Sequence, residues 1–352
     1  MNFELEKVVR PHILNLAPYS SARDEYTGKE GVFLDANENP LGSATPENWN
    51  RYPDPYQWTI KEKLAAIKGC RPSQIFLGNG SDEPIDLIIR LTCEPKEDNI
   101  IILPPTYGMY EVSASVNNVE IQKIALKSDF QLDVDAILAA INPKTKLIFI
   151  CSPNNPTGNI IDRQAILTII ENFQQGIVIL DEAYNDFADE PSFIPELDSF
   201  SNVMVLQTFS KAWGLASLRL GMAFAGEELV KLLNKIKYPY NINGLTQKLL
   251  IENISNTQFV VDSVKTLNEN RTWLADELLK LSIVTHIFPS DANFLLVQFT
   301  EAKAIFDYLI ENKTIVRDRS KVMLCDNSLR ISVGTIEENV ILMDFLKEYA
   351  SK

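Results

Sequence analysis

Apolar segments of strand length alternate with segments of helical pattern through the first two-thirds of this 352-residue chain. Strands covered on both faces are short and almost wholly apolar, whereas helices repeat apolar residues every three or four positions. Alternation of the two predicts a mainly parallel sheet of seven strands lying between helices, an α/β fold. The strands are expected at Ile75–Leu77, Asn99–Leu103, Glu120–Ala125, Lys146–Cys151, Gly176–Leu180, Val203–Gln207 and Leu220–Ala225.

A second, smaller domain is expected where this alternation stops. After Leu245 the sequence changes to a long helical stretch reaching about Leu281, and then to a short set of strands and helices of α+β type. We therefore expect an N-terminal segment, residues 1–30, packed with the small domain, a large domain at 31–244, and the small domain at 245–352. The helices of the large domain are expected at Trp58–Lys68, Asp82–Cys93, Tyr107–Ser115, Val134–Ala140 and Arg163–Phe173.

Composition excludes several classes of function. A net charge of -14 argues against a broad surface for nucleic acid or anionic membrane. No apolar run has the length of a membrane span, and the start of the chain lacks the pattern of a signal peptide. The four cysteines are scattered without metal-ligand spacing, so neither a zinc site nor a disulfide framework is indicated. These features together predict a cytoplasmic protein without membrane or nucleic-acid partners.

Only two histidines are present, His12 and His286, both in ordinary contexts. A catalytic triad or a histidine-rich metal site would have to use one of them. An enzyme built from this chain is therefore expected to move protons with a lysine, a carboxylate or a tyrosine.

The segment from Thr208 to Arg219 carries the strongest chemical signal. It follows an expected strand and places Lys211 at the carboxyl edge of the sheet, where open α/β sheets bind their ligands. Arg219 supplies a planar cation suited to phosphate, and Thr208 and Ser210 supply hydroxyl donors. A lysine beside a phosphate-binding group suggests a Schiff base with a phosphorylated aldehyde cofactor. An ordinary strand-to-helix turn with a solvated lysine is the alternative.

Other strand ends carry motifs that are individually weak. Gly80, Ser81 and Asp82 open a helix after a strand, so their N–H groups could hold a phosphate, although helix capping explains much of the pattern. Tyr107 follows the next strand and could stack on an aromatic cofactor, but packing alone would account for it.

Two further strands end in polar groups. The amide of Asn155 is a donor at the sheet edge, within a turn that Pro and Gly already favour. Asp181 ends a buried strand and needs a partner, which a protonated pyridine nitrogen would supply; an N-cap or a salt bridge is the alternative. All these groups, together with Tyr184 and Lys211, are expected at one edge of the sheet. A single shared site therefore explains them better than a separate structural role for each.

Taken in order, these motifs resemble those of the fold type I pyridoxal-phosphate aminotransferases and, in detail, the histidinol-phosphate aminotransferase family. The resemblance runs from about Leu16 to Thr335. One departure is YNING at Tyr240–Gly244, where the family is richer in proline and serine, so the shape of the domain hinge is not given by the resemblance. The matching segments are LAPYSSARDE, LDANENP, RYPDPY, GSDEPIDLIIR, PPTYGMY, SPNNPTG, DEAYNDF, TFSKAWGLASLRLG, IVRDR and LRISVGT.

The resemblance implies a role for each matching residue. Lys211 would form the Schiff base with pyridoxal 5'-phosphate and carry the proton, and Asp181 would pair with the pyridine nitrogen. Tyr52 would reach the cofactor phosphate of a neighbouring subunit, which implies a homodimer with shared sites. The remaining cofactor-binding residues would be Gly80, Ser81, Asp82, Tyr107, Asn155, Tyr184, Thr208, Ser210 and Arg219, and the substrate-binding residues Tyr19, Asn37, Arg317 and Arg330.

The activity implied is transamination of L-histidinol phosphate with 2-oxoglutarate, giving imidazole-acetol phosphate and glutamate. An aromatic-amino-acid aminotransferase or a decarboxylase of a phosphorylated amino acid is the nearest alternative. A regulatory ligand-binding domain would need a basic DNA-binding module, which this acidic chain lacks. A nicotinamide dehydrogenase is disfavoured because Glu83 replaces the last glycine of the dinucleotide motif and Lys211 would have no role.

Overall fold

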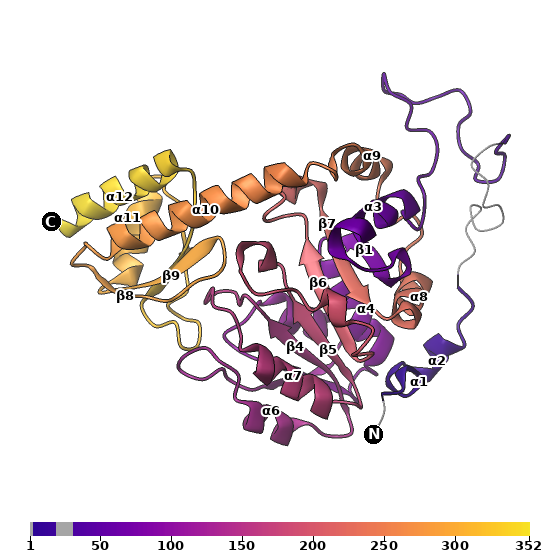
Figure 1. Ribbon diagram of the computed structural model, residues 1–352, viewed down its shortest axis with the longest axis horizontal. Coiled ribbons are helices and arrows are strands. Elements are labelled where there is room, and N and C mark those ends of the chain that lie inside the picture. Colours follow the sequence, from indigo (N-terminus) through magenta and orange to yellow (C-terminus); the bar gives the residue numbers. More distant parts are fainter. Residues whose placement is uncertain (1–2, 19–30) are drawn as a thin grey trace.

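A computed structural model describes residues 3–18 and 31–352 of the chain. Its centre is a seven-stranded sheet in the order β1-β7-β6-β5-β4-β2-β3 (Figure 1). Only β7 runs against its neighbours, which confirms the expected mainly parallel sheet. The strands are β1 (Ile75–Asn79), β2 (Asn99–Ile102), β3 (Glu120–Lys123), β4 (Thr145–Cys151), β5 (Ile177–Asp181), β6 (Val203–Thr208) and β7 (Leu220–Ala225).

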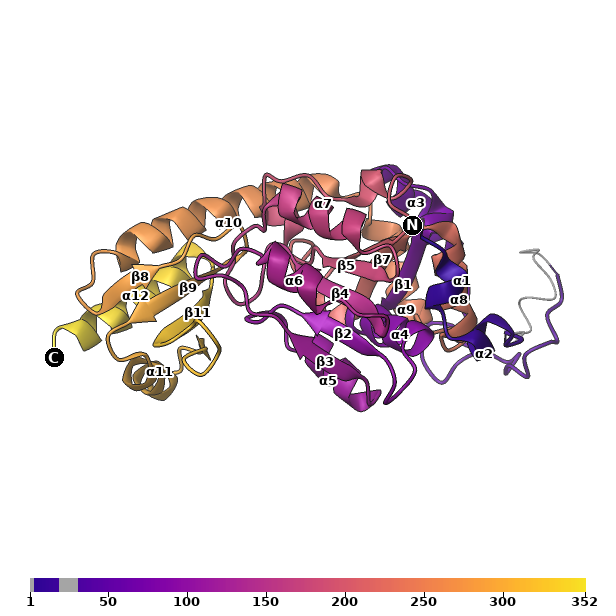
Figure 2. The same ribbon diagram turned by 90° about the horizontal axis from the view of Figure 1, so that it is seen from below.

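Alternate residues of the central strands enter two separate cores. In β4, Ile148 and Ile150 pack on one face, whereas Leu147 and Phe149 pack on the other. Side chains of a strand point alternately to the two faces, so both sets must be apolar when helices cover both faces. Figure 2 shows this three-layer arrangement edge-on. One face is covered by α3 (Trp58–Lys68), α6 (Val134–Ala140) and α7 (Arg163–Asn172), the other by α4 (Asp82–Thr92), α5 (Met109–Val116) and α8 (Glu227–Ile236).

The expected strands and helices of this large domain are found within about two residues of their predicted ends. The helix α8 was not predicted, although Leu229, Val230 and Leu233 give it a clear buried side. Capping explains several boundaries. Asp133 and Asp162 begin α6 and α7 by accepting hydrogen bonds from the N–H groups of Ala136 and Ala165.

The smaller domain is a four-stranded antiparallel sheet in the order β10-β11-β9-β8 with helices packed against it. Its core is formed mainly by leucine side chains from the sheet and helices, with isoleucine and valine beside them. This agrees with the α+β domain expected from the sequence. The elements are β8 (Val284–Ile287), β9 (Phe294–Phe299), α11 (Ala302–Glu311), β10 (Arg317–Asp318), β11 (Ser328–Ser332) and α12 (Ile336–Ala350).

The expected helical stretch after Leu245 is two helices, α9 (Gly244–Asn253) and α10 (Thr257–Leu278). The first packs on α3 of the large domain, where Lys63 Nζ donates to the carbonyl oxygen of Ile251 at 2.9 Å. The second spans from the large domain to the small one in Figure 1. The division expected at residues 244–245 is therefore better placed at the turn of residues 254–256.

The described part of the N-terminal segment packs on the large domain, so the expectation that it packs with the small domain is wrong for these residues. Val8 and Ile13, in α1 (Leu5–Val8) and α2 (Pro11–Leu14), enter the core beside α4 and α8. The guanidinium of Arg10 pairs with Glu94 at 2.9 Å, and its backbone N–H donates to Leu91. Apolar burial and this ion pair hold the segment there.

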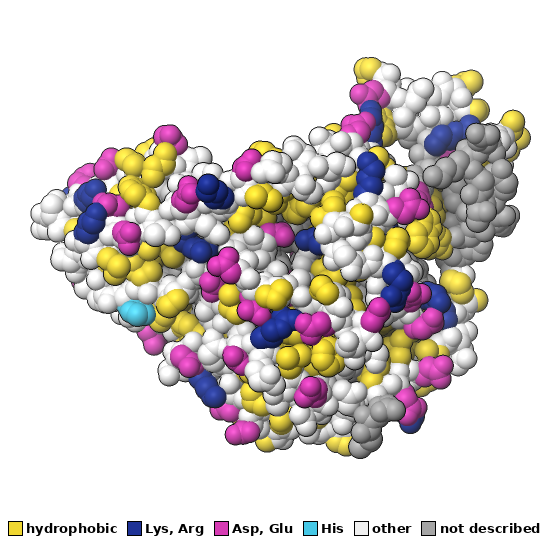
Figure 3. All heavy atoms as spheres, viewed as in Figure 1, with side chains coloured by type: hydrophobic (Ala, Val, Ile, Leu, Met, Phe, Trp, Pro, Cys, Tyr) yellow, Lys and Arg dark blue, Asp and Glu magenta, His cyan; other side chains and the backbone are white. Residues whose placement is uncertain are grey.

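No helix among residues 3–18 and 31–352 is long and apolar enough to cross a membrane. The four cysteines are free thiols. Acidic and basic side chains are interspersed on the face shown in Figure 3, so the net charge of -14 is not concentrated in one patch there.

One buried cation lies away from the sheet edge. The side chain of Lys61, on α3, is only 2% exposed, and its ammonium lies 5.4 Å from the centre of the Trp58 ring. Burial lowers the Lys61 pKa to about 7, and the nearby charge of Lys237 contributes to this; the carboxylate of Asp54 opposes it. Because a buried ammonium is poorly solvated, the protonated form of Lys61 destabilises the fold.

Replacing this lysine by methionine is expected to stabilise the protein at pH 7 and to flatten its pH dependence. Between pH 7 and the lysine's ordinary pKa of 10.5, the unfolded chain binds up to one more proton than the folded protein. The free energy of unfolding of the wild type should therefore rise by about 2 kcal/mol from pH 7 to pH 9, whereas that of Lys61→Met should not gain this increment. Urea unfolding at both pH values measures this. Lys63→Met is the control for losing a lysine from the same helix, and equal pH dependence in all three proteins would contradict the expectation.

Candidate functional site

The predicted site residues lie at one edge of the large sheet. Strands β1, β2, β4, β5 and β6 run in the same direction, so their carboxyl ends share that edge. The antiparallel β7 begins there, which brings Arg219 beside the loop after β1. Ligands of open α/β sheets bind at this position.

The loop after β1 forms a cup with the start of β7. Gly80 has φ +69°, and its N–H donates to the carbonyl oxygen of Arg219 at 2.9 Å. A Cβ on Gly80 would lie 2.9 Å from Nη2 of Arg219, and one on Gly221 would lie 2.2 Å from the backbone nitrogen of Ser81. Only glycine permits such close approach of two backbones and a guanidinium. The first turn of α4, beginning at Asp82, adds helix N–H groups to this cup.

Hydroxyl groups and a ring surround the cup. The Oγ1 of Thr208 donates to Oγ of Ser210 at 3.0 Å and accepts a hydrogen bond from the Ser210 N–H. The hydroxyl of Tyr107 donates to Asp82 Oδ1 at 3.0 Å, which fixes the half-buried ring at the sheet edge. The carboxylate of Asp82 is also 3.9 Å from the Arg219 guanidinium. The structure thus brings together the residues that the sequence predicts to bind the cofactor phosphate.

Asp181 ends β5 and is 3% exposed. Its Oδ2 accepts a hydrogen bond of 2.6 Å from the hydroxyl of Tyr110, and its Oδ1 accepts one of 3.1 Å from the N–H of Ala183. No Lys or Arg among the described residues forms an ion pair with it. Burial raises the pKa of Asp181, while the hydrogen bonds from Tyr110 and Ala183 oppose that rise. A buried carboxylate without a cation is suited to receive a cationic ligand group.

Asn155 links the two sheets. Its Nδ2 donates to the hydroxyl oxygen of Tyr184 at 3.2 Å, and its Oδ1 accepts a hydrogen bond of 2.5 Å from Nη1 of Arg330 on β11. The Nε of Arg330 is buried without a hydrogen-bond partner among the described residues. Arg330 is therefore positioned by the large domain yet retains an unused donor.

Lys211 lies between these groups, in the turn after β6. Its ammonium is 5.5 Å from the centre of the Tyr184 ring. Although the residue as a whole is exposed, surrounding protein removes enough water from the ammonium to lower the Lys211 pKa. Arg330 lowers this pKa further, Asp181 opposes the change, and Arg219 adds to it. The pKa of the Lys211 amine therefore depends on the charge of Arg219 in the cup and on that of Arg330 in the smaller sheet.

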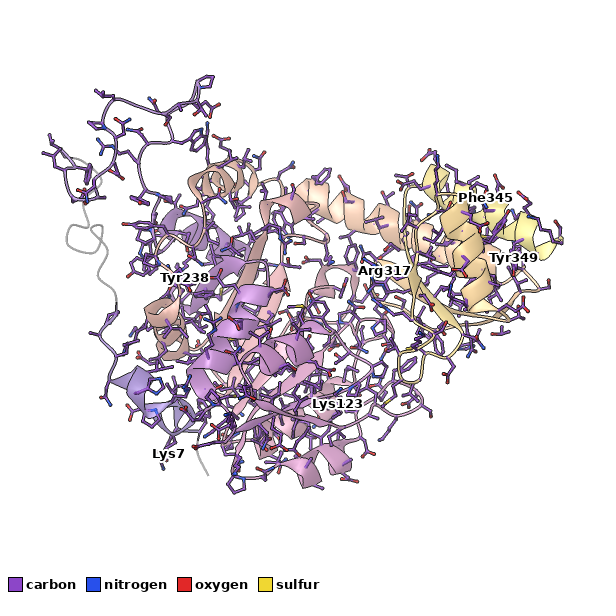
Figure 4. The ribbon with its side chains drawn as sticks, turned by 180° about the vertical axis from the view of Figure 1, so that it is seen from behind. Lys7, Lys123, Tyr238, Arg317, Phe345 and Tyr349 are labelled. Carbon is purple, nitrogen blue, oxygen red and sulfur yellow. The ribbon has the colours of Figure 1, made fainter. Side chains whose placement is uncertain are left out.

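Arg317 is exposed on β10 and stands opposite Arg330 in the antiparallel pairing of β10 with β11. Figure 4 shows it at the side of the smaller domain nearest the large one. Two guanidinium groups therefore come from neighbouring strands at the side of the site opposite the cup.

Two predicted residues, Tyr52 and Asn37, are not joined to this site within the described part of the chain. Tyr52 and Asn37 lie on the arm, residues 31–57, which extends away from the body in Figure 1. The Tyr52 ring stacks on Tyr240 at 4.5 Å, and its N–H donates to Glu38 at 2.6 Å. Asn37 is exposed, with φ +54°. Tyr19 lies outside the described residues.

Sequence reasoning missed two contacts at this edge. Tyr110 is fully buried against Asp181, and its spacing of three residues from Tyr107 could have suggested that both rings face one way. The hinge at Tyr240–Gly244 is tied to the cup: Asn241 Nδ2 donates to the Leu77 carbonyl oxygen at 2.9 Å and to the Glu83 carboxylate at 3.1 Å. Nothing in the sequence alone paired Asn241 with Glu83.

Comparison with known proteins agrees with this geometry. The sequence profile of the family described as aminotransferase class I and II matches residues 25–346. The histidinol-phosphate aminotransferase of Cytophaga hutchinsonii is 55% identical over 349 residues, which are 99% of this chain and 100% of that protein. The enzyme of the same name from Bacteroides fragilis is 53% identical over 346 residues, covering 98% and 99%.

A solved structure has the same fold. The histidinol-phosphate aminotransferase of Sinorhizobium meliloti, in complex with pyridoxal-5'-phosphate, aligns with a TM-score of 0.79 at 23% identity, over 90% of each chain. This confirms the expected fold type I architecture. The chain therefore belongs to the class I and II aminotransferases and, within them, to the histidinol-phosphate aminotransferase family.

Proposed function

We propose that this protein is a pyridoxal-phosphate-dependent aminotransferase that interconverts L-histidinol phosphate and 2-oxoglutarate with imidazole-acetol phosphate and glutamate. The observation that carries the proposal is the position of Lys211. Its amine lies within electrostatic reach of a buried carboxylate, Asp181, and of arginines on two opposite sides, Arg219 and Arg330. This arrangement provides for an anionic cofactor on one side and an anionic substrate on the other.

The residues present fit the cofactor. The cup at Gly80 offers backbone N–H groups, hydroxyls and a guanidinium, which suit a phosphate. Asp181 is a buried carboxylate without an ion-pair partner among the described residues, and a pyridinium N–H would supply one. The rings of Tyr107 and Tyr184 provide an aromatic face and a phenol nearby.

When bound, pyridoxal phosphate supplies an aldehyde for the substrate's amino group and a ring that takes up electrons when the α-proton leaves. In our proposal Lys211 Nζ would hold the aldehyde carbon of the cofactor and would carry the proton. The lowered Lys211 pKa increases the fraction of neutral amine that can accept that proton at neutral pH. Asp181 would pair in its ionised form with the ring nitrogen, and Asn155 and Tyr184 would hydrogen-bond the ring's phenolic oxygen.

We assign the cofactor phosphate to Gly80, Ser81, Asp82, Thr208, Ser210 and Arg219, the first three through backbone N–H groups. Arg330, Arg317 and Tyr19 are assigned to the anionic groups of the substrates, together with Asn37. The contacts of Arg330 support its assignment, because its Nη1 donates to Asn155 and its Nε has no hydrogen-bond partner among the described residues. A guanidinium accepts carboxylate or phosphate oxygens in a fork, so one residue can serve both substrates.

The direct test is to purify the protein with pyridoxal phosphate and assay it with histidinol phosphate and 2-oxoglutarate. We expect a yellow protein that borohydride bleaches, with a pyridoxyl group on the peptide containing Lys211, and glutamate formed in proportion to histidinol phosphate consumed. Release of carbon dioxide without a keto acid would instead identify a decarboxylase. A preference for tyrosine or phenylalanine as amino donor would identify an aromatic-amino-acid aminotransferase.

We also propose that the protein is a cytoplasmic homodimer whose arm completes the partner's site. The arm carries apolar side chains that contact little of their own chain: Leu41 is 93% exposed and Val32 88%. Apolar side chains also gather beneath the arm in Figure 3, and Tyr238 is exposed on the same side of the body in Figure 4. Such a surface suits an isologous contact with a second copy. Tyr52, 51% exposed on the arm, would then reach the cofactor phosphate of the partner.

Mixing two inactive variants should restore activity if Tyr52 acts across the dimer. A Tyr52→Phe subunit retains Lys211 but lacks the hydroxyl, and a Lys211→Ala subunit retains the hydroxyl but lacks the amine. Each mixed dimer would contain one complete site, so random pairing should restore about one quarter of wild-type activity. The assay is specific activity at limiting cofactor, with each variant alone as the control. If mixing restores nothing while mixed dimers form, Tyr52 acts within its own subunit.

A further inference from the structure

A buried phenol lies against Asp181 on the side of helix α5. Tyr110 is completely buried, and its hydroxyl is 2.6 Å from Asp181 Oδ2. Its ring stacks on Phe149 of β4 with centres 4.7 Å apart, and meets the ring of Tyr107 edge-on at 5.6 Å. Packing on both sides fixes the ring, so the position of the hydroxyl is fixed as well.

The direction of this hydrogen bond follows from the groups involved. An ionised carboxylate only accepts, so the phenol must donate. Asp181 Oδ1 is held separately by the N–H of Ala183 at 3.1 Å. Each carboxylate oxygen therefore has one fixed donor, which sets the plane of the carboxylate and leaves further lone pairs for a third donor.

Burial works against this arrangement. Buried among apolar groups, Asp181 would tend to take up a proton, and burial raises its pKa. The Tyr110 hydroxyl opposes that rise, while burial and the Asp181 charge raise the pKa of Tyr110 itself, so the phenol keeps its proton. The thiol of Cys151 next to the pair is also buried, and its pKa is raised by burial and by Asp181, so it adds no negative charge.

We propose that Tyr110 is a positioning residue, which holds the Asp181 carboxylate ionised and oriented so that it can pair with the ring nitrogen of the cofactor. This inference rests on the proposed function, because it requires a pyridine ring at Asp181. Tyr110 itself touches neither cofactor nor substrate in this assignment. Its hydroxyl contacts Asp181 and the neutral Cys151 thiol, so the effect of the hydroxyl on the cofactor's ring nitrogen must pass through Asp181, and that requirement makes the proposal testable.

The experiment is a double-mutant cycle on cofactor affinity. Apo forms of the wild type, Tyr110→Phe, Asp181→Asn and the double variant are titrated with pyridoxal phosphate, and the dissociation constant is read from the visible absorption. Phenylalanine keeps the ring and its stacking on Phe149. Loss of the hydroxyl should weaken binding about tenfold when Asp181 is present, and less than about twofold in the Asp181→Asn background, because coupled residues are not additive.

A second ligand separates the ring nitrogen from the phosphate. An analogue of pyridoxal phosphate with CH in place of the ring nitrogen offers Asp181 no donor. Tyr110→Phe should bind this analogue as the wild type does. Tyr308→Phe is the matched control, since it removes a phenolic oxygen from the aromatic cluster with Phe345 and Tyr349, labelled in Figure 4, far from Asp181. It should change neither affinity.

Infrared spectroscopy gives a readout independent of affinity. A protonated Asp181 shows a carboxylic-acid C=O stretch that Asp181→Asn removes. In the cofactor-loaded wild type this band should be absent at neutral pH, and in apo Tyr110→Phe it should appear at higher pH than in the apo wild type. If Tyr110→Phe does not fold, the wild-type spectrum still decides, because the band at neutral pH would overturn the proposal.

Failure of this inference is distinguishable from failure of the proposed function. Equal weakening by Tyr110→Phe with and without Asp181, or for both ligands, would show a general structural role and overturn the inference alone. A wild-type protein that gives no saturable absorption change with pyridoxal phosphate would overturn the proposed function, and this inference with it.

Discussion

Lys211→Ala is expected to abolish transamination. The substitution removes the amine that would bind the cofactor's aldehyde carbon and the group that would carry the proton. Among the described residues, Lys211 is the lysine whose charge acts on the Asp181 carboxylate. A loss of at least about 1,000-fold in kcat is expected, ~4 kcal/mol in the barrier. Steady-state formation of glutamate from histidinol phosphate and 2-oxoglutarate measures it.

Cofactor binding should survive this substitution in part. The cup around Gly80, the hydroxyls of Thr208 and Ser210, and Asp181 are untouched by it. Lys211→Arg is a matched control that keeps the positive charge but cannot form the bond to the aldehyde carbon, and it should be as inactive as Lys211→Ala. Activity of Lys211→Ala within about tenfold of the wild type would contradict the assignment of this lysine.

Arg330→Ala should weaken both half-reactions, whereas Arg317→Ala should weaken mainly the one with histidinol phosphate. Both substrates carry an anionic group for Arg330, but the phosphate of histidinol phosphate is larger and more highly charged and should use Arg317 more fully. A charge-assisted hydrogen bond contributes roughly 1.5–3 kcal/mol, or about tenfold to a hundredfold in affinity. Stopped-flow measurement of each half-reaction separates the two substrates.

Arg330→Lys tests whether charge alone is sufficient. Lysine restores a cation but not the planar fork, so recovery should be partial in both half-reactions. The wild-type bond from Arg330 Nη1 to Asn155 Oδ1 would also be changed, so the cofactor absorption of each variant must be recorded alongside the rates. Equal losses in both half-reactions for Arg317→Ala would make it a general anion-binding residue, and specificity for the phosphate would have to come from other groups.

Much of the large domain could be predicted because its sequence patterns are local. The short apolar runs at Val203–Leu206 and Leu220–Ala225 favour buried strands, and strand direction places the polar groups that follow β6 at the edge of the sheet. Strand order alone therefore predicts that Lys211, Asp181 and Asn155 lie at the same edge of the sheet.

The remaining features depend on contacts between distant segments. The side chain of Tyr110 reaches Asp181 across 71 positions, and Asn241 reaches Glu83 across 158. No local pattern encodes such pairs. The packing of α1 on α4 was missed for the same reason, since four residues with two buried valines nearby would suit either domain. In our proposal the role of Tyr52 would depend on a second chain, which no single-chain pattern describes.

The strand order has a consequence for how the protein is made. The first strand, β1, pairs only with β7, whose residues are synthesised more than a hundred positions later. During synthesis on the ribosome, β1 has no strand to pair with until Leu220–Ala225 has emerged. That segment must then insert between β1 and β6, so the loop at Gly80 stays beside an unpaired strand edge until that point. Closing so long a segment is slow compared with forming a local helix. We expect the phosphate cup to be among the last parts of the large domain to form during synthesis, so a nascent chain should acquire affinity for phosphate only after β7 is complete.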